Sequence, residues 1–175
     1  RGLGDVYKRQ DYVFINDGWA KNGTYCIIRR IQIHIETWDR TALEEQEATF
    51  GRKRGSGAPL TGKKEFDELD LKAKDSTGEY VIPEDAHARL AREAKTSIKR
   101  RAYNYTAGTN EKTGNLETGL LFISFQKSPQ QFIDIQNHLG HKDKLNEYIT
   151  HRGTATFIVL PGVQKGGYLG ETLFN

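Results

Sequence analysis

The sequence is poor in the residues that build covalently linked or metal-held scaffolds. Of its 175 residues one is a cysteine, Cys26, and none is a methionine. A single cysteine excludes an intramolecular disulfide and a zinc site built from a cysteine cluster. No stretch approaches the roughly 18 consecutive apolar residues of a membrane-spanning helix, so we expect no membrane span. What remains is the composition of one globular domain.

Charge of either sign is also not concentrated anywhere. The 26 lysines and arginines and the 23 aspartates and glutamates are spread along the chain and leave a net charge of +3. A nucleic-acid-binding domain typically gathers its basic residues in a run or on one face. We therefore expect no nucleic-acid partner.

The first ten residues, RGLGDVYKRQ, differ in character from the rest. They resemble the translated sequencing-adapter stretch found at the ends of open reading frames from metagenomic assemblies. We predict that residues 1–10 are a non-native leader and that the native domain occupies residues 11–175. Because the chain starts at an arginine, we expect it to be part of a longer protein.

Hydrophobic periodicity predicts strands and helices in alternation. Residues 24–36 end in a period-two alternation that is typical of a half-buried strand. Further strands are predicted over residues 98–106, 119–126 and 154–163. With no internal repeat, this order indicates an α+β fold with helices packed on one face of a sheet.

Helix signals separate these strands. Thr41 followed by Glu44 is typical of a capping box, and Gly51 marks the end of the helix that it predicts over residues 41–50. A second helix is expected to begin near Pro83, and an amphipathic helix covers residues 128–140. Residues 51–78 lack periodicity and are predicted to form a long surface loop.

Most of the histidines have an ordinary interpretation. His34 falls on the polar side of its strand, and His138 and His141 have a metal-like spacing without a carboxylate or cysteine pattern to support it. His151 follows the same helix. The sequence also contains no GxSxG or HExxH motif and no phosphate-binding loop.

His87 stands in a different setting. Ala86 and Ala88 flank it, and small neighbours let a large flat cofactor approach a histidine closely. A neutral imidazole is the usual proximal ligand of a haem iron, although a core histidine is the other interpretation. Arg100 and Arg101 follow, with charges that could meet haem propionates or stabilise charge on bound peroxide.

Several long segments in one order resemble the C-terminal half of a dye-decolourising peroxidase. The similarity covers residues 23–174 and is greatest to the deferrochelatase-like branch, which is associated with bacterial iron uptake. The segments that carry it are GTYCIIRRIQIHIETWDRTALEEQEATFGRKRGSGAPL, IPEDAHARLA, IKRRAYNY, GLLFISFQ, LNEYITH, and FIVLPGV with GGYLGETLF.

The resemblance implies haem b as the cofactor and assigns roles to four residues. His87 corresponds to the histidine that ligates the haem iron, and Arg100 to the catalytic distal arginine of the family. Arg92 is a candidate contact for a haem propionate. Glu147 is a candidate carboxylate partner for His87, with an ordinary surface glutamate as the equal alternative.

The resemblance also implies the architecture, a ferredoxin-like antiparallel sheet with helices on one face. Such a sheet is the second half of a two-module peroxidase of the dimeric α+β barrel type. One motif departs from the family pattern. The family carries a second distal residue, an aspartate in GxxDG, whereas FINDGW has Phe14 at the first position, so Asp17 is not its equivalent.

The expected activity is reduction of hydrogen peroxide coupled to oxidation of dyes or porphyrins, with removal of iron from haem as the finer expectation. The family further implies an organic reductant or porphyrin as partner, iron-uptake components, a homo-oligomer, and export to the periplasm or outside the cell. Two alternatives stay open at this point. One is a haem-binding or haem-transfer module without turnover, and the other is a structural ferredoxin-like interaction domain.

Overall fold

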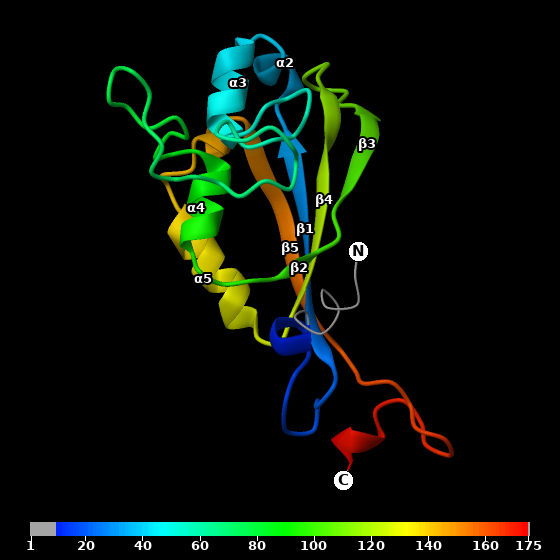
Figure 1. Ribbon diagram of the computed structural model, residues 1–175. Coiled ribbons are helices and arrows are strands. Elements are labelled where there is room, and N and C mark those ends of the chain that lie inside the picture. The colour runs from blue at the N-terminus through cyan, green and yellow to red at the C-terminus, as the bar shows by residue number, and fades with distance from the viewer. Residues whose placement is uncertain (1–9, 175) are drawn as a thin grey trace.

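The fold is seen in a computed structural model that describes residues 10–174 (Figure 1). The predicted non-native leader falls almost wholly on residues 1–9, which lie outside the described residues. It therefore stays a prediction.

Five antiparallel strands form one sheet. Their order is β2-β4-β1-β5, and β3 also pairs with β4. Along β4, Arg100 of β2 lies opposite Ser124 and Tyr103 of β3 lies opposite Leu121, so the two short strands keep one register. The strands are β1 (Thr24–Ile33), β2 (Lys99–Arg100), β3 (Tyr103–Thr109), β4 (Leu116–Gln126) and β5 (Ile149–Val159).

If β2 and β3 count as one interrupted strand, the chain reads β-α-β-β-α-β with the fourth and third strands flanking the first. This is the ferredoxin-like arrangement. Figure 1 shows the helices on one side of the sheet, which confirms the predicted α+β fold class.

The strand boundaries differ from the prediction in several places. The strand expected over residues 24–36 ends at Ile33, because a short helix begins at Ile35, and the strand expected over residues 119–126 already begins at Leu116. The strand expected over residues 98–106 is interrupted after Arg100. The last strand begins at Ile149, five residues earlier than expected, because Ile149 pairs with Ile33 at the far end of β1. It ends at Val159, two residues before Pro161, which cannot donate a backbone hydrogen bond to a neighbouring strand.

Several α-helices and two 3₁₀ helices accompany the sheet in the described residues, and residues 10–13 form one helical turn ahead of β1. The last long helix, α5, matches its prediction: Ser128 forms the capping box with Gln131, Pro129 is the first helical residue, and Gly140 ends the helix. The others are α2 (Ile35–Trp38), α3 (Leu43–Phe50), α4 (His87–Glu93), η1 (Lys144–Glu147) and η2 (Glu171–Leu173), and α5 covers Pro129–Leu139.

The start of α3 corrects the predicted capping box. The helix begins at Leu43, and Ala42 caps it without a side-chain hydrogen bond. Thr41 lies one residue before this cap, and its Oγ1 donates to the carbonyl of Thr37, 3.0 Å away. The predicted end is confirmed, since Gly51 adopts a left-handed conformation with φ of 72°.

The start of α4 is also later than predicted. The amide of Ala86 donates to the carbonyl of Pro83 at 3.2 Å, which closes a turn ahead of the helix. The helix proper begins at His87. The long loop before it is confirmed, and it holds only two isolated strand-like pairs, Arg52 with Pro59 and Lys74 with Tyr80.

The register of the sheet decides which side chains face the helices. Arg29 of β1 donates to Gln136 of α5, and Phe122, directly opposite Arg29 on β4, contacts Phe132 of the same helix. Side chains on a strand alternate between the two sides. Ile27 therefore also faces the helices, together with its opposite residues Ser124 and Thr156.

Strand β5 contains one irregularity. Arg30 lies opposite Gly153, but Ile31 lies opposite His151, so Arg152 is an extra residue in β5. Such a bulge places His151 on the same side of the sheet as Ile31. Within residues 10–174, no helix is long and apolar enough to cross a membrane.

Candidate functional site

A histidine–aspartate pair joins the start of α4 to the segment before η1. Nδ1 of His87 lies 2.7 Å from Oδ2 of Asp143, and the side chains are 26% and 3% exposed. The other carboxylate oxygen of Asp143 accepts from the backbone amide of Leu145 at 3.0 Å. Asp143 is thus both the N-cap of η1 and the partner of His87.

This pair fixes the orientation of the imidazole. A neutral His87 that donates from Nδ1 to a carboxylate carries its lone pair on Nε2. Ligating histidines in metal proteins are usually held in this way, and the carboxylate raises the basicity of the ligand nitrogen. The arrangement leaves Nε2 of His87 as the one ring nitrogen that can bind a metal.

The partner of His87 corrects one prediction. Glu147 was one candidate for this place, with an ordinary surface glutamate as the alternative. The structure puts Asp143 there, and Glu147 lies exposed at the end of η1, as the alternative expected. The sequence contained a signal for Asp143 as an N-cap residue. An aspartate just before a short helix can accept a hydrogen bond from the backbone amide two residues later, here that of Leu145. Nothing in the sequence indicated the contact of Asp143 with a residue 56 positions away.

Apolar packing holds the start of α4 against the end of α3. The rings of Phe50 and His87 meet edge to face with centroids 6.3 Å apart. Ala86 is fully buried, and a Cβ on Gly51 would lie 3.3 Å from that of Ala86. Glycine at this point therefore lets the two helices approach closely enough to seat His87.

The two arginines of the IKRRAYNY segment lie on opposite sides of the sheet. Arg100 is opposite Ser124 and so faces the helix side, whereas the next residue, Arg101, faces away. The Oγ of Ser124 is buried and finds no hydrogen-bond partner among the described residues. A buried polar atom without a partner indicates a place for a ligand or a water molecule beside Arg100.

Arg29 and His151 add basic character to the same side of the sheet, and no motif in the sequence groups these two residues. Nε of Arg29 donates to Thr154 at 2.9 Å, and its guanidinium lies 4.8 Å from the centre of the Phe132 ring. Burial lowers the pKa of Arg29. Desolvation and then the charge of Arg29 lower the pKa of His151, and Asp143 opposes this change.

Arg92 lies exposed in the last turn of α4, with no side-chain hydrogen bond or ion pair to the described part of the chain. Its neighbour Arg89 is different, since it is 8% exposed and donates to the carbonyl of Ile82 at 2.9 Å. The guanidinium of Arg89 also lies over the ring of Tyr80. Arg89 thus holds the long loop, and Arg92 is free to reach a ligand.

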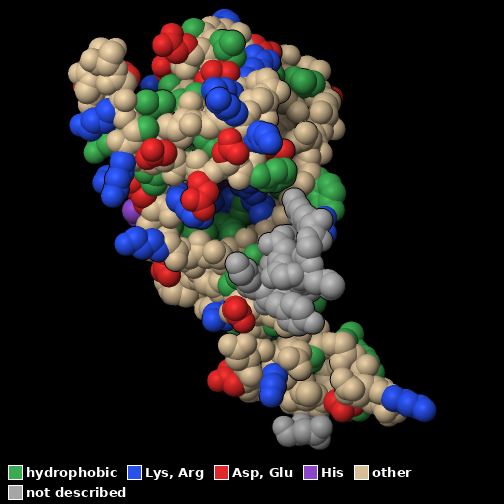
Figure 2. All heavy atoms as spheres, in the orientation of Figure 1, with side chains coloured by type: hydrophobic (Ala, Val, Ile, Leu, Met, Phe, Trp, Pro, Cys, Tyr) green, Lys and Arg blue, Asp and Glu red, His purple; other side chains and the backbone are tan. Residues whose placement is uncertain are grey.

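Figure 2 shows that the molecule is hollowed between the helices and the sheet, with hydrophobic and basic side chains inside the hollow. No group of three or more histidine, cysteine, aspartate or glutamate residues in the described chain could hold a bare metal ion, His138 and His141 included. A haem brings four nitrogen ligands of its own and needs one histidine. The residues present therefore fit a haem better than a protein-only metal site.

The same assignment follows from comparison with known proteins. Residues 5–164 match the family profile described as "Dyp-type peroxidase, C-terminal". A deferrochelatase of Yersinia pestis is 42% identical over 164 residues, and a dye-decolorizing peroxidase of Thermobifida fusca is 38% identical over 162 residues. Each alignment covers 90% of this chain but 37% of the relative, so the chain spans under two fifths of their length.

Solved structures agree in fold. The DyP-type peroxidase of Cellulomonas bogoriensis has a TM-score of 0.91 at 38% identity, over 98% of this chain and 49% of that one. An oxyferrous complex of DtpA from Streptomyces lividans has a TM-score of 0.90 at 33% identity, over 100% of this chain and 49% of that one. By these matches and by its fold, the chain belongs to the Dyp-type peroxidase family and corresponds to the C-terminal part of its members.

Proposed function

We propose that the protein carrying this chain is a haem peroxidase that reduces hydrogen peroxide and oxidises an organic reductant. The observation that carries the proposal is the pair of His87 and Asp143. It holds an imidazole at the start of a helix with Nδ1 engaged by a nearly buried carboxylate. The family of the chain and the names of its relatives support the same activity.

Haem b is the form of the cofactor that we propose, and Nε2 of His87 would bind its iron. When bound, the haem supplies the iron at which peroxide is reduced. Asp143 draws the Nδ1 proton toward itself and so increases electron donation from His87 to a metal. Arg92 remains a candidate for contact with a propionate of the porphyrin.

Arg100 is the residue to which we assign the catalytic role toward peroxide. It lies on the helix-facing side of the sheet, next to the unpartnered hydroxyl of Ser124. A fixed guanidinium favours the deprotonated form of peroxide and stabilises the negative charge that develops on its leaving oxygen. Arg101, directed to the other side, cannot take this role without a rearrangement of the strand.

The finer features of the proposal rest on the relatives. Dyes and porphyrins are the proposed reductants, and removal of iron from haem is proposed because several relatives bear the name deferrochelatase. Export to the periplasm or beyond, association with iron-uptake components and a homo-oligomeric state complete the proposal.

Substitution of His87 tests the cofactor assignment. Haem added to His87→Ala should give a weaker and shifted Soret band, because the axial nitrogen is lost while the apolar contacts of the porphyrin persist. His138→Ala is the matched control and should keep the spectrum of the unaltered protein. The measurement is the ratio of Soret to protein absorbance in a haem titration. Identical spectra for the two variants would remove His87 as the ligand.

Substitution of Arg100 tests the catalytic assignment in the longer protein that carries this chain. Arg100→Leu should retain haem and lose about a hundredfold in peroxide turnover, as when a preorganised charge is removed from a reacting oxygen. Arg101→Leu removes the same charge one residue away and should leave turnover within about threefold. Equal losses in both variants would move the role away from Arg100.

A haem-binding module without turnover is the second candidate function. It is favoured if the longer protein lacks the distal aspartate of the family, which the segment FINDGW, with Phe14 at the first position, does not supply. The two functions separate in one experiment. A haem-loaded protein that shows the histidine-ligated spectrum yet consumes no peroxide has the second function.

A further inference from the structure

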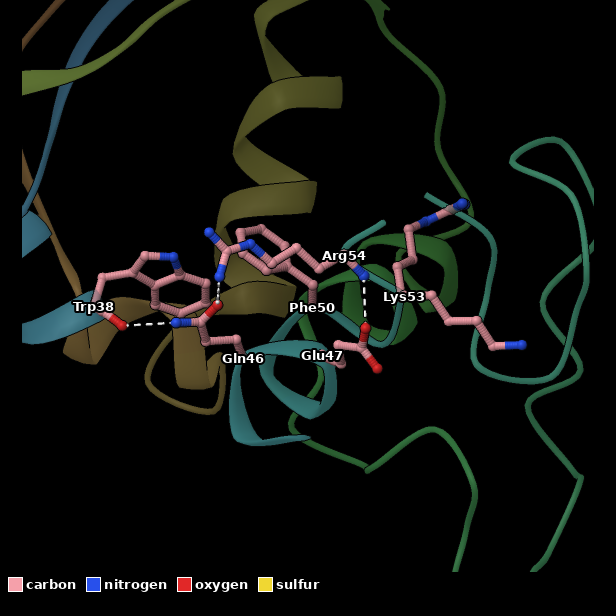
Figure 3. A pocket seen from close by; sticks show the side chains of 7 residues that line it. Trp38, Gln46, Glu47, Phe50, Lys53 and Arg54 are labelled. Carbon is pink, nitrogen blue, oxygen red and sulfur yellow. Dashed lines mark hydrogen bonds between the residues drawn. The ribbon is translucent and has the colours of Figure 1, made fainter. Parts of the chain in front are cut away.

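A second pocket lies away from the hollow, at the end of α3. Its volume is about 260 Å³, and its walls come from Trp38 of α2, from α3 and from residues 52–54 of the following loop (Figure 3). The rings of Trp38 and Phe50 line it and meet edge to face, with centroids 5.5 Å apart. This volume is close to the lower end of ligand pockets in general, ~300 Å³, and suits one or two fused rings.

The polar wall of this pocket is rigid. Gln46 is 3% exposed, and its Nε2 donates to the carbonyls of Trp38 at 2.8 Å and Thr41 at 3.1 Å. Its Oε1 accepts from Nη1 of Arg54 at 3.0 Å. Figure 3 shows Arg54 extended across the pocket toward Gln46 and Trp38. The buried amide therefore holds the guanidinium of Arg54 in place, which lowers the entropic cost of ordering this side chain when a ligand binds.

The charge of the pocket is positive and not neutralised. Its lining has three cations, at residues 52–54, and one carboxylate, Glu47, which leaves two positive charges. Arg52 donates to the carbonyls of Gly57 and Glu65, and Lys53 to that of Gly62, all of which are uncharged acceptors. Within residues 10–174, none of the three cations forms an ion pair. Arg54 keeps most of its five N–H donors for a further partner.

We propose that this pocket binds an aromatic anion, a ring system of one or two rings that bears a carboxylate or a sulfonate. The rings would lie against Trp38 and Phe50, and the anionic group would accept paired hydrogen bonds from Arg54. Tight binding needs both the ring and the anionic group. Sulfate lacks the ring that would pack on Trp38 and Phe50, and a neutral arene lacks the charge that would pair with Arg54.

The pocket is separate from the proposed haem site but adjacent to it. Phe50 forms a wall of the pocket on one side and contacts the ring of His87 on the other. A bound aromatic anion would thus lie one ring away from His87. The proposal does not require haem, so its test and that of the peroxidase function can fail independently.

The indole N–H resonances offer a direct test, because Trp19 and Trp38 are the only tryptophans. Naphthalene-2-sulfonate titrated into ¹⁵N-labelled haem-free chain should shift the Trp38 indole signal in a saturable manner, with Trp19→Phe to assign it. 2-Naphthylmethanol and inorganic sulfate, as the neutral ring and the bare anion, should each bind at least tenfold more weakly. Equal binding of either probe would overturn the proposal, as would the absence of a Trp38 shift.

Two charge variants locate the anionic group. Arg54→Gln should weaken naphthalene-2-sulfonate binding about tenfold, as expected for a lost charge-assisted hydrogen bond. The matched control is Arg40→Gln, since Arg40 follows Trp38 closely but does not line the pocket, and it should change affinity less than twofold.

Glu47→Gln keeps a side-chain oxygen for the amide of Arg54 and removes the one negative charge, so it should tighten binding about twofold to threefold. This variant keeps the test decisive if Arg54→Gln disturbs the loop. Equal effects of Arg54→Gln and Arg40→Gln, or weaker binding by Glu47→Gln, would overturn the assignment.

Discussion

His87 and His138 each lie beside a carboxylate, His87 beside Asp143 and His138 beside Glu93. The nitrogen–oxygen distances are 2.7 and 3.6 Å. The side chain of Asp143 is 3% exposed, and that of Glu93 is 37% exposed. An exposed pair is screened by water and contributes little, whereas a buried carboxylate depends on its hydrogen bonds. Local sequence gives both histidines similar settings near helix ends, so burial of the partner is what separates a candidate ligand from a surface residue.

The largest expected effect comes from removal of the buried carboxylate. Asp143→Ala removes the cap of η1 and leaves Nδ1 of His87 without its acceptor, and together these losses should lower the free energy of unfolding by about 2 to 4 kcal/mol. The measurement is urea denaturation of the haem-free chain at neutral pH. Asp134→Ala, on the exposed side of α5, is the control and should change stability by less than about 0.5 kcal/mol. A similar small change in both variants would show that the buried carboxylate of Asp143 does not stabilise the fold more than an exposed one.

A smaller effect is expected when each pair is broken from its histidine. His87→Ala leaves the Asp143 carboxylate with its bond to the Leu145 amide but without an imidazole, which should cost about 1 to 3 kcal/mol. His138→Ala breaks an exposed contact and should cost about 0.5 kcal/mol or less. Both values come from the same denaturation experiment. If the two costs are equal, the burial of Asp143 has no energetic consequence for His87.

The smallest effect concerns the segment that holds Asp143 in place. The ion pair with Glu45 raises the pKa of Lys144, the residue next to Asp143. Because folding raises this pKa, the ion pair contributes fully to the free energy of unfolding below the ordinary lysine pKa. Its contribution is lost as the pH rises through the raised value. Unfolding midpoints of the unaltered chain should therefore fall slightly more than those of Lys144→Met as the pH rises above about 10, through the ordinary lysine pKa and beyond. Parallel pH profiles would show that this pair does not support the Asp143 segment.

The sequence predicted the elements whose signals are local. The capping box of α5 and the terminating Gly51 are set by residues within a few positions, and both were confirmed. The strand predicted from the alternation over residues 24–36 also forms, but it ends at Ile33, and Gln32 on its predicted polar face is buried. The capping box expected at Thr41 was wrong because the helix begins at Leu43, with Ala42 rather than Thr41 in the N-cap position. Local signals thus identify an element more reliably than its first residue.

The site divides in the same way. The motif around His87 and the position of Arg100 could be read from the chain, because each falls within one short segment. Asp143 could not, since its role depends on a contact across 56 residues. The different directions of Arg100 and Arg101 depend on the register against β4, and the order of the residues alone does not give that register.

The bulge at Arg152 has a consequence for how this strand tolerates change. On each side of the bulge the residues of β5 alternate normally, but the two stretches are offset by one position relative to β1. Because Arg152 is the extra residue, its deletion would restore a continuous alternation and leave His151 opposite Ile31, with the imidazole still on the side of Asp143 and the helices. The bulge therefore gives β5 a reserve of one residue: a single deletion at this point can be absorbed without a change of side, whereas a second would exchange the sides of every position that precedes it.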